Sequence, residues 1–459
     1  MIEIMKNIFI TFFILLSIVA FGQQKQEKLN GKIDFGNGII LNTFLNIEQK
    51  DKNVKITSPK NADFRIFGKT KGILGRIFGK SPKKGILMTI DSKKINDSLI
   101  GTMKIPMFGK LKFKGIYKNE ILNGEMIKDD TLVIGTLKGY KGTYQKFDYP
   151  LLYPKIMEIT ESNIFNKSVL QSKKWKKSQK KIVKLLNNIN DDIELFIGFN
   201  MLGYEVPFSH YGIFIQKDTI DETNDTEEND DSEKSEATVT FKEMNNNTAY
   251  LKIKNFSSSQ QELSDILPGI VEKEYKNLII DLRNNGGGGI EAAFELAKYI
   301  ENEEIVIGYF VTNKLKYSGF ELDLFQKLPV VKMQSTKKFV ESLKKGKGSK
   351  LVFNKSNNPV FLGDLYVLTN GNTASTCEPI VYQLKQSKKA TIVGENTMGA
   401  MLSAAYFNIQ DKYKLYLPIA DFYTYDGVRL EGIGVAPNIE TKSDDALDKA
   451  LEIIKNKTE

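Results

Sequence analysis

The first long stretch of the chain alternates apolar and polar residues with a period of two. Short runs at 38–49, 85–92, 110–118 and 131–139 show this alternation, and Asn, Asp and Gly turns separate them. The period places successive side chains on opposite faces of a strand, and many short strands at regular spacing are typical of an antiparallel sandwich or barrel. The pattern predicts an N-terminal antiparallel β domain over 29–146, which we interpret as an accessory binding or interaction module.

The period becomes helical in the next segment. Apolar residues recur every three or four positions over 153–200, with many lysines on the other face, which predicts a short helical subdomain over 150–215 that includes a histidine segment. The lysines at 173–184 fit a solvated helix face, and contact with an anionic surface is the alternative.

An acidic stretch follows. Residues 218–236 hold ten acidic residues and one Lys, and low hydrophobicity with like charges predicts a linker or loop over 216–245. Calcium binding is the alternative, although the stretch lacks the Gly and the spaced Glu of a calcium loop.

From 246 to 457, continuously apolar strands alternate with helical segments. Examples of such strands lie at 277–283 and 364–370. Apolar strands followed by helices are typical of a sheet that is covered on both faces. The pattern predicts an α/β domain over 246–457, and the chain as a whole is expected to be multidomain. Its helices are expected near 259–274, 290–300 and 374–387.

The first 22 residues read as an export signal. Lys6 precedes an apolar run over 8–21, and the small residues Ala20 and Gly22 are spaced as in a cleavage site. We predict a signal peptide over 1–22, an exported periplasmic or extracellular protein, and no stable membrane insertion after cleavage. The run is shorter than the ~20 residues of a spanning helix, and an uncleaved anchor is the alternative.

Composition narrows the function classes. At 459 residues the chain has room for two or three domains. Its net charge is +9, yet only four basic residues are Arg, the residue that phosphate and guanine recognition favours. We therefore expect no nucleic-acid partner. The single His and single Cys exclude zinc sites built on several such residues and disulfides within the chain, and no metal or cofactor is expected.

Two segments of the α/β region carry candidate chemistry. Four glycines at 286–289 follow a buried strand, where backbone amides can approach a ligand closely. A tight turn, a phosphate site and an oxyanion hole are all compatible with them, although neither GxGxxG nor a Walker lysine is present. Ser375 lies at the start of a helix after a strand. With Glu378 it makes a capping-box pattern, but a serine at such an elbow can also be a nucleophile.

Two further residues gain meaning only in combination with these. His210 is the only histidine of the chain and directly follows Ser209; a lone histidine is commonly structural. Glu431 precedes a Gly-rich turn and Pro437, and by itself it reads as a surface charge at a strand end.

Taken as a set, these segments resemble the C-terminal processing, or tail-specific, serine peptidase family, which includes the tricorn-like peptidases. The resemblance covers about 150–445 and implies a catalytic domain of the crotonase- and ClpP-like spiral type that acts on a peptide or protein substrate. No PDZ module is evident, because only about 30 residues, mostly acidic, separate 215 from the strand at 249. The motifs are LIIDLRNNGGG (278–288), TNGNTASTCE (369–378), GENTMG (394–399) and EGIGVAPN (431–438).

The resemblance implies a role for each matched residue of the nucleophile segment. Ser375 would be the acylating nucleophile. The amide of Thr376, with that of Gly286 or Gly287, would form the oxyanion hole. In the tail-specific branch a lysine follows the glycine of GE-x-T-x-G and activates the serine, but this chain has Ala400 there.

The tricorn-like branch uses a Ser-His pair upstream and a glutamate downstream, and this chain has both. The resemblance then implies that His210 is the general base, that Ser209 orients its imidazole, and that Glu431 braces Ser209. We expect an exported serine endopeptidase. The alternatives are a catalytically inactive peptide- or lipid-binding protein on the peptidase scaffold, and an esterase with the same groups. The sequence does not indicate an oligomeric state.

Overall fold

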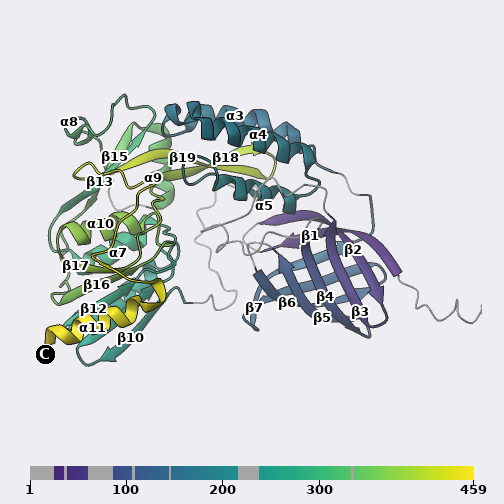
Figure 1. Cartoon of the computed structure of the whole chain (residues 1–459), viewed down its shortest axis with the longest axis horizontal. Helices are drawn as coiled ribbons and strands as arrows, with labels where there is room; N and C mark the ends of the chain where they lie inside the picture. The colour runs from purple at the N-terminus through teal and green to yellow at the C-terminus, as the bar shows by residue number, and fades with distance from the viewer. Residues whose placement is uncertain are drawn as a thin grey trace, which may run out of the picture.

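A barrel, a group of helices and a domain with two sheets follow one another in the computed structural model of the chain (Figure 1). The predicted signal peptide at 1–22 and the acidic stretch at 218–236 lie outside the described residues. The structure describes residues 25–35, 39–59, 86–105, 109–143, 146–215, 237–331 and 335–458.

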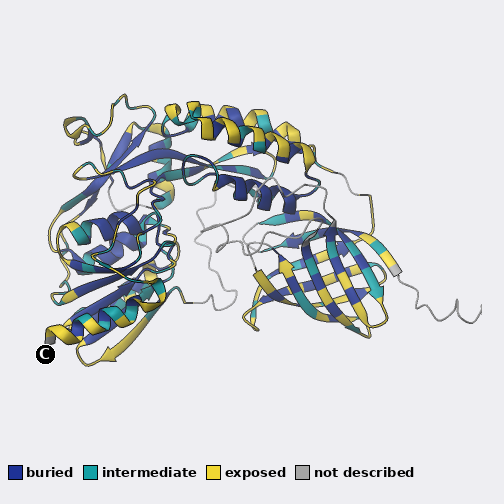
Figure 2. Ribbon diagram, viewed as in Figure 1, coloured by how far each residue is buried: buried dark blue, intermediate teal, exposed yellow. Residues whose placement is uncertain are grey.

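The N-terminal domain is a closed barrel of eight antiparallel strands, in which β1 pairs with both β2 and β8. Of the two architectures that the alternation allows, the structure has the barrel. Inward side chains such as Leu45, Ile56, Phe113 and Leu137 are fully buried and fill the interior, while the alternate positions face outward (Figure 2). The strands are β1 Lys25–Asp34, β2 Ile40–Lys50, β3 Asn53–Pro59, β4 Ile86–Ile95, β5 Ser98–Ile105, β6 Gly109–Lys118, β7 Ile121–Lys128 and β8 Leu132–Tyr140.

The helical subdomain forms where the sequence predicts it. The hydroxyl of Ser172 caps α4 by accepting a hydrogen bond from the N–H of Trp175 at 3.1 Å. Trp175, Ile182 and Leu185 bury one face of this helix, and its lysines lie on the outer side. Helix α5 is buried nearly all round (Figure 2). The elements are η2 Tyr149–Leu151, α3 Leu152–Asn163, η3 Lys167–Gln171, α4 Lys173–Asn188 and α5 Asp192–Gly203.

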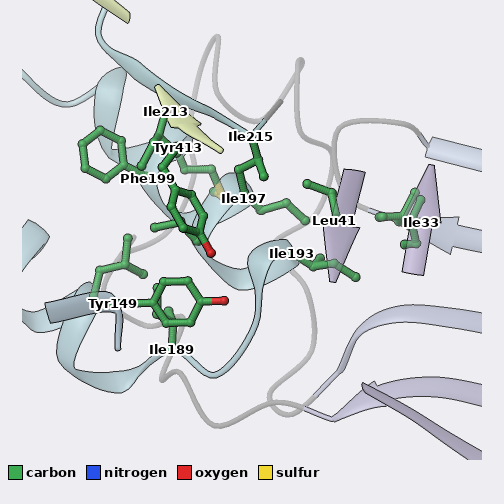
Figure 3. Packing of buried hydrophobic residues seen from close by; sticks show 14 of the residues in the cluster. Ile33, Leu41, Tyr149, Ile189, Ile193, Ile197, Phe199, Ile213, Ile215 and Tyr413 are labelled. Atoms are coloured by element: carbon green, nitrogen blue, oxygen red, sulfur yellow. The ribbon is translucent and has the colours of Figure 1, made fainter. Parts of the chain in front are cut away.

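One apolar core runs from the barrel through the helices into the C-terminal domain, where it includes Tyr413 (Figure 3). Buried aspartates lie where the barrel meets the helices. Asp192 accepts a hydrogen bond from the N–H of Asn42 at 2.8 Å and another from the hydroxyl of Tyr413 at 2.8 Å. Asp191 accepts a hydrogen bond from the hydroxyl of Thr43 at 2.7 Å. The barrel is therefore packed and hydrogen-bonded to its neighbours.

The first sheet of the C-terminal domain has the order β10-β11-β12-β16-β17-β20 and is parallel from β11 onward. Leu278 and Ile280 pack on one face with α6, α7 and α10, whereas Ile279 packs on the other with α11, which explains the continuous apolar run. The strands are β10 Val239–Asn245, β11 Thr248–Ile253, β12 Asn277–Asp281, β16 Asp364–Thr369, β17 Ala390–Gly394 and β20 Ile439–Glu440.

The second sheet has the order β14-β15-β13-β19-β18, with β9 pairing to β19. Its long strands pair antiparallel. Strand periodicity identifies some of these strands but does not assign them to a separate sheet. The strands are β9 Gly212–Ile215, β13 Ile305–Thr312, β14 Val330–Val331, β15 Gly348–Phe353, β18 Ser403–Gln410 and β19 Tyr413–Thr424.

The structure corrects the C-terminal limit of the predicted linker. Within the predicted range 216–245, residues Val239–Asn245 form the edge strand β10, because their backbone pairs with β11. No helix in the described ranges has the length and apolarity that crossing a membrane requires. The remaining helices are α6 Gln260–Glu272, α7 Ile290–Ile300, α8 Leu322–Phe325, α9 Thr336–Lys345, α10 Cys377–Gln386, η4 Ser443–Asp445 and α11 Ala446–Thr458.

Candidate active site

Ser375 lies at the elbow between β16 and α10. Its φ of 55° places it in the left-handed region, a strained conformation for a residue with a side chain and one that is common at functional sites. The N–H of Ser375 donates to Oε2 of Glu378 at 3.0 Å. The helix cap is Thr376, without a side-chain cap bond. Of the two hydrogen bonds of a capping box, only the one that Glu378 accepts is therefore formed. The hydroxyl of Ser375 forms no hydrogen bond to any described residue.

The glycine run approaches this elbow closely. A Cβ at Gly287, whose φ is 94°, would lie 2.7 Å from the Cβ of Ser375 and 2.9 Å from the backbone nitrogen of Thr376, so only glycine fits there. The N–H of Gly287 donates a hydrogen bond to Oδ1 of Asn285 at 2.9 Å. Gly286 is exposed, and the N–H groups of Gly286 and Thr376 donate to no described residue.

Asparagines tie the glycine loop to the nucleophile loop. The N–H of Asn284 donates to Oδ1 of Asn370 at 3.0 Å, and Nδ2 of Asn370 donates back to Oδ1 of Asn284 at 3.0 Å. The N–H of Ala374 donates to the carbonyl of Asn285 at 3.0 Å. Sequence reasoning did not assign these asparagines a role, and the available signal was an Asn-rich turn in each of the two motifs.

The histidine segment connects α5 to β9. Oε1 of Glu431 accepts a hydrogen bond from the N–H of Ser209 at 2.8 Å, and its Oε2 accepts one from the hydroxyl of Ser209 at 3.0 Å. The Ser209 oxygen also lies 2.6 Å from Nδ1 of His210. A hydroxyl has one proton to donate. Since that proton goes to Glu431, Nδ1 of His210 carries the proton in this second bond, and Nε2 has a free lone pair.

Burial shifts both ionisable groups of this relay. It lowers the pKa of His210 to about 4, so the partly buried imidazole is neutral near pH 7 and can accept a proton. Burial also raises the pKa of Glu431, against the hydrogen bonds from Ser209 and Met401 that favour its ionised form. His210 itself has a φ of 59°, so both proposed proton-transfer residues have left-handed backbones.

A second buried carboxylate connects the nucleophile to the relay. Glu378 accepts hydrogen bonds from the N–H groups of Gly399 at 2.7 Å and of Ala400 at 2.8 Å. The next amide, that of Met401, donates to Oε2 of Glu431 at 2.8 Å. The position where the related branch has a lysine thus supplies a backbone amide, and no described lysine hydrogen-bonds to the hydroxyl of Ser375.

The candidate residues therefore form two groups. Ser209, His210 and Glu431 are joined by direct hydrogen bonds, and the backbones of Gly287 and Thr376 adjoin Ser375. Among the described residues, no hydrogen bond joins His210 to Ser375. The connection between the groups runs through the adjacent amides at 400 and 401. The described ranges also contain no group of three or more His, Cys, Asp or Glu placed to hold a metal ion.

Comparison with known proteins identifies the two-sheet domain as a peptidase domain. Residues 247–441 match Peptidase family S41, and this domain belongs to that family. The chain is 24% identical over 189 residues to the carboxy-terminal-processing protease of Bartonella bacilliformis, covering 40% of this chain and 36% of the relative. It is also 24% identical to the chloroplastic carboxyl-terminal-processing peptidase 1 of Arabidopsis thaliana, covering 41% and 32%.

The chain thus spans about a third of the length of these curated relatives. Among solved structures, it is similar to the tricorn protease with a TM-score of 0.39 and 11% identity, covering 92% of this chain and 57% of that one.

Proposed function

We propose that this chain is an exported serine endopeptidase that hydrolyses peptide bonds through an acyl-enzyme. The observation that carries the proposal is the Ser209 relay: the hydroxyl proton goes to Glu431 and the Nδ1 proton of His210 goes to Ser209, which leaves Nε2 basic. The export part of the proposal rests on the sequence pattern at 1–22.

In the proposed mechanism, Nε2 of His210 takes the proton of the Ser375 hydroxyl as the oxygen attacks the peptide carbonyl carbon. The carbonyl oxygen becomes an oxyanion, which the N–H groups of Thr376 and Gly286 receive. The geometry favours Gly286 over Gly287, because the N–H of Gly287 is already donated to Asn285.

The intermediate then collapses. The C–N bond breaks, and the proton on His210 passes to the departing amine. Water next attacks the acyl-enzyme and gives a proton to His210. The bond between the acyl carbon and the Ser375 oxygen then breaks, His210 returns the proton to that oxygen, and the carboxylic acid leaves. The ionised Glu431 favours the transient imidazolium through Ser209.

A fluorophosphonate probe tests the nucleophile. It should label the wild-type protein at Ser375, and Ser375→Ala should abolish both labelling and peptide hydrolysis. Cleavage that persists undiminished in Ser375→Ala would refute the nucleophile. His210→Ala should also lose activity, and full activity in that variant would refute the base.

One observation favours a second candidate, a catalytically inactive peptide-binding protein on the peptidase fold. Within the described part of the chain, Ser375 and His210 are not hydrogen-bonded to each other. In an unliganded protease such bonds can be long and tighten only with substrate. A wild-type protein that binds peptides but neither cleaves them nor reacts with the probe would establish the second candidate.

A further inference from the structure

The outer face of the barrel carries a patch of exposed isoleucines. Each is more than half exposed, from 51% at Ile121 on β7 to 60% at Ile95 on β4. Ser98 pairs with both Ile95 and Ile116, so the isoleucines are direct or diagonal neighbours across adjacent strands. Exposed apolar residues that are grouped in this way mark an interaction site, whereas single ones do not. We call this patch the isoleucine face: Ile95, Ile100, Ile116 and Ile121.

Lysines are interleaved with these isoleucines. Ile100 pairs with Lys93 on one side and with Lys114 on the other, and Ile121 pairs with Lys118. Lys118 forms an ion pair with an aspartate at 3.1 Å, whereas Lys93 and Lys114 form no ion pair with any described residue. The isoleucine face is therefore apolar and positively charged at once.

A hollow of about 470 Å³ opens on the same face. Ile100 and Ile116 line it, and so do Lys114 and Lys138. Glu125 is the one acidic side chain among the described residues that line it. The volume lies within the roughly 300–1,000 Å³ in which proteins hold small organic groups. The hollow therefore offers an anionic group two ammonium groups beside apolar side chains.

This mixture of charge and apolar surface distinguishes between possible occupants. The centre of a protein–protein interface is depleted in lysine, because burying an ammonium group removes its water. Two copies of the isoleucine face would also bring like charges together. At the surface of an anionic bilayer, apolar side chains enter the interface while lysine side chains keep their ammonium groups among the headgroups. The isoleucine face fits the bilayer.

We propose that the isoleucine face docks the barrel on an anionic lipid bilayer, with Ile100 and Ile116 entering the boundary between headgroups and acyl chains and Lys114 and Lys138 contacting headgroup phosphates. Strands β4, β5 and β6 lie on the side of the barrel away from α5, which is hydrogen-bonded to β2 (Figure 1). The proposed catalytic residues all lie outside the barrel. The inference thus goes beyond the proposed peptidase function and does not depend on it.

Co-sedimentation with lipid vesicles tests the docking. The mature protein, which begins at Gln23 in the proposed export, is used so that the apolar run at 8–21 is absent. It should bind vesicles of equal parts phosphatidylglycerol and phosphatidylcholine at least roughly tenfold more tightly than phosphatidylcholine alone, because each lysine near an anionic surface adds about fivefold. Salt at about 1 M, where the Debye length is about 3 Å, should remove this preference.

Two double variants separate the apolar contribution from the charged one. Ile100→Thr with Ile116→Thr keeps β-branched side chains at exposed strand positions and should weaken binding to the mixed vesicles at least roughly tenfold. Lys114→Gln with Lys138→Gln should weaken it by a similar factor of roughly ten or more. Thermal unfolding shows which variants are folded.

Matched controls change the same residue types elsewhere. Lys176→Gln with Lys177→Gln removes the same charge from the exposed side of α4. Leu362→Thr replaces a leucine that is 89% exposed outside the barrel. Both controls should bind the mixed vesicles as the wild-type protein does. An equal loss in the α4 variant would show that binding follows net charge alone, which would overturn the assignment of a specific face.

Other outcomes would also overturn the docking. Wild-type affinity in a folded isoleucine or lysine variant would exclude the isoleucine face. A protein that binds no vesicles, but forms a dimer that the isoleucine variant dissociates, would assign the face to a second copy of the chain. Fluorophosphonate labelling of Ser375, measured without vesicles, should be the same in all these variants, so the docking and the peptidase proposal can fail separately.

Discussion

Glu431→Gln removes one charge and keeps the size of the side chain. In the native protein Oε1 of Glu431 accepts the N–H of Ser209 at 2.8 Å, while Oε2 accepts the Ser209 hydroxyl at 3.0 Å and the N–H of Met401 at 2.8 Å. A glutamine has one acceptor oxygen and one NH₂ group. Whichever end carries the NH₂ group faces a backbone N–H, so neither orientation satisfies all partners.

The orientation with NH₂ at the Oε2 position also reverses the relay. The Ser209 oxygen then accepts from the NH₂ group and turns its own proton toward Nδ1 of His210. Nδ1 becomes an acceptor, and the proton of the neutral ring moves to Nε2. A ring with its proton on Nε2 has no lone pair there to accept the proton of Ser375, and any imidazolium that forms has lost the negative charge of Glu431.

The expected magnitude follows from these lost bonds. A hydrogen bond to a charged group contributes about 1.5–3 kcal/mol, and one decade in rate corresponds to about 1.4 kcal/mol. Glu431→Gln should lower the rate of fluorophosphonate labelling at Ser375, and kcat/KM for a peptide, by roughly 100-fold or more. It should lower the free energy of unfolding by about 2 kcal/mol.

Glu262→Gln is a matched control for the structural part of this loss. Glu262 accepts the N–H of Thr238 at 3.0 Å, its hydroxyl at 2.5 Å and the N–H of Val239 at 2.9 Å, the same donor pattern at the start of β10. This variant should lose comparable stability in urea unfolding and keep wild-type labelling. If Glu431→Gln is labelled as fast as Glu262→Gln, the relay does not act in catalysis.

Three further outcomes are expected. Burial lowers the pKa of His210 to about 4, so the acid limb of kcat/KM against pH should have its midpoint below the usual histidine value of about 6.5; a midpoint at or above that value would contradict the neutral base. Because Ser375 has a φ of 55°, Ser375→Gly should be more stable than Ser375→Ala by about 1 kcal/mol in chemical denaturation, and equal stability would show that the elbow is unstrained. Burial, together with the negative charge of Glu194, raises the pKa of Asp191 to about 7. Between about pH 4 and 7 the folded protein therefore holds a proton that the unfolded chain has lost. The free energy of unfolding should fall as pH rises through this range, by at most about 1.4 kcal/mol per pH unit. Asp191→Asn should remove this slope from urea midpoints measured between pH 4 and 7, and a slope unchanged in the variant would assign it elsewhere.

Local periodicity predicts the elements of this fold well because each element buries a face that its own sequence specifies. The alternating runs at 38–49 and 110–118 become β2 and β6, and the lysine-rich amphipathic run becomes α4. The division into domains is less visible. Asp191 and Asp192 look like ordinary helix-start residues, and their bonds to the barrel join positions about 150 residues apart. The local spacing of apolar and polar residues does not predict contacts between such distant positions.

The candidate site shows a similar division. Residue types and motif order predict Ser209, His210 and Glu431, and the structure joins all three by hydrogen bonds. Motif matching assigns roles to side chains. A backbone N–H can bind an oxyanion only if the fold leaves it without another hydrogen-bond acceptor, and a motif does not show this. For this reason the sequence could not choose between Gly286 and Gly287, whereas the bond from Gly287 to Asn285 favours Gly286.

The loop at 399–401 acquires a different role in a chain without the dyad lysine. Its amides at Gly399 and Ala400 hold Glu378, which in turn holds the N–H of Ser375. The next amide, at Met401, holds Glu431. Consecutive Cα atoms are about 3.8 Å apart, so the nucleophile elbow and the histidine relay are anchored to neighbouring peptide groups. The backbone of this one loop therefore holds both carboxylates, and through them it positions the nucleophile elbow and the histidine relay relative to each other.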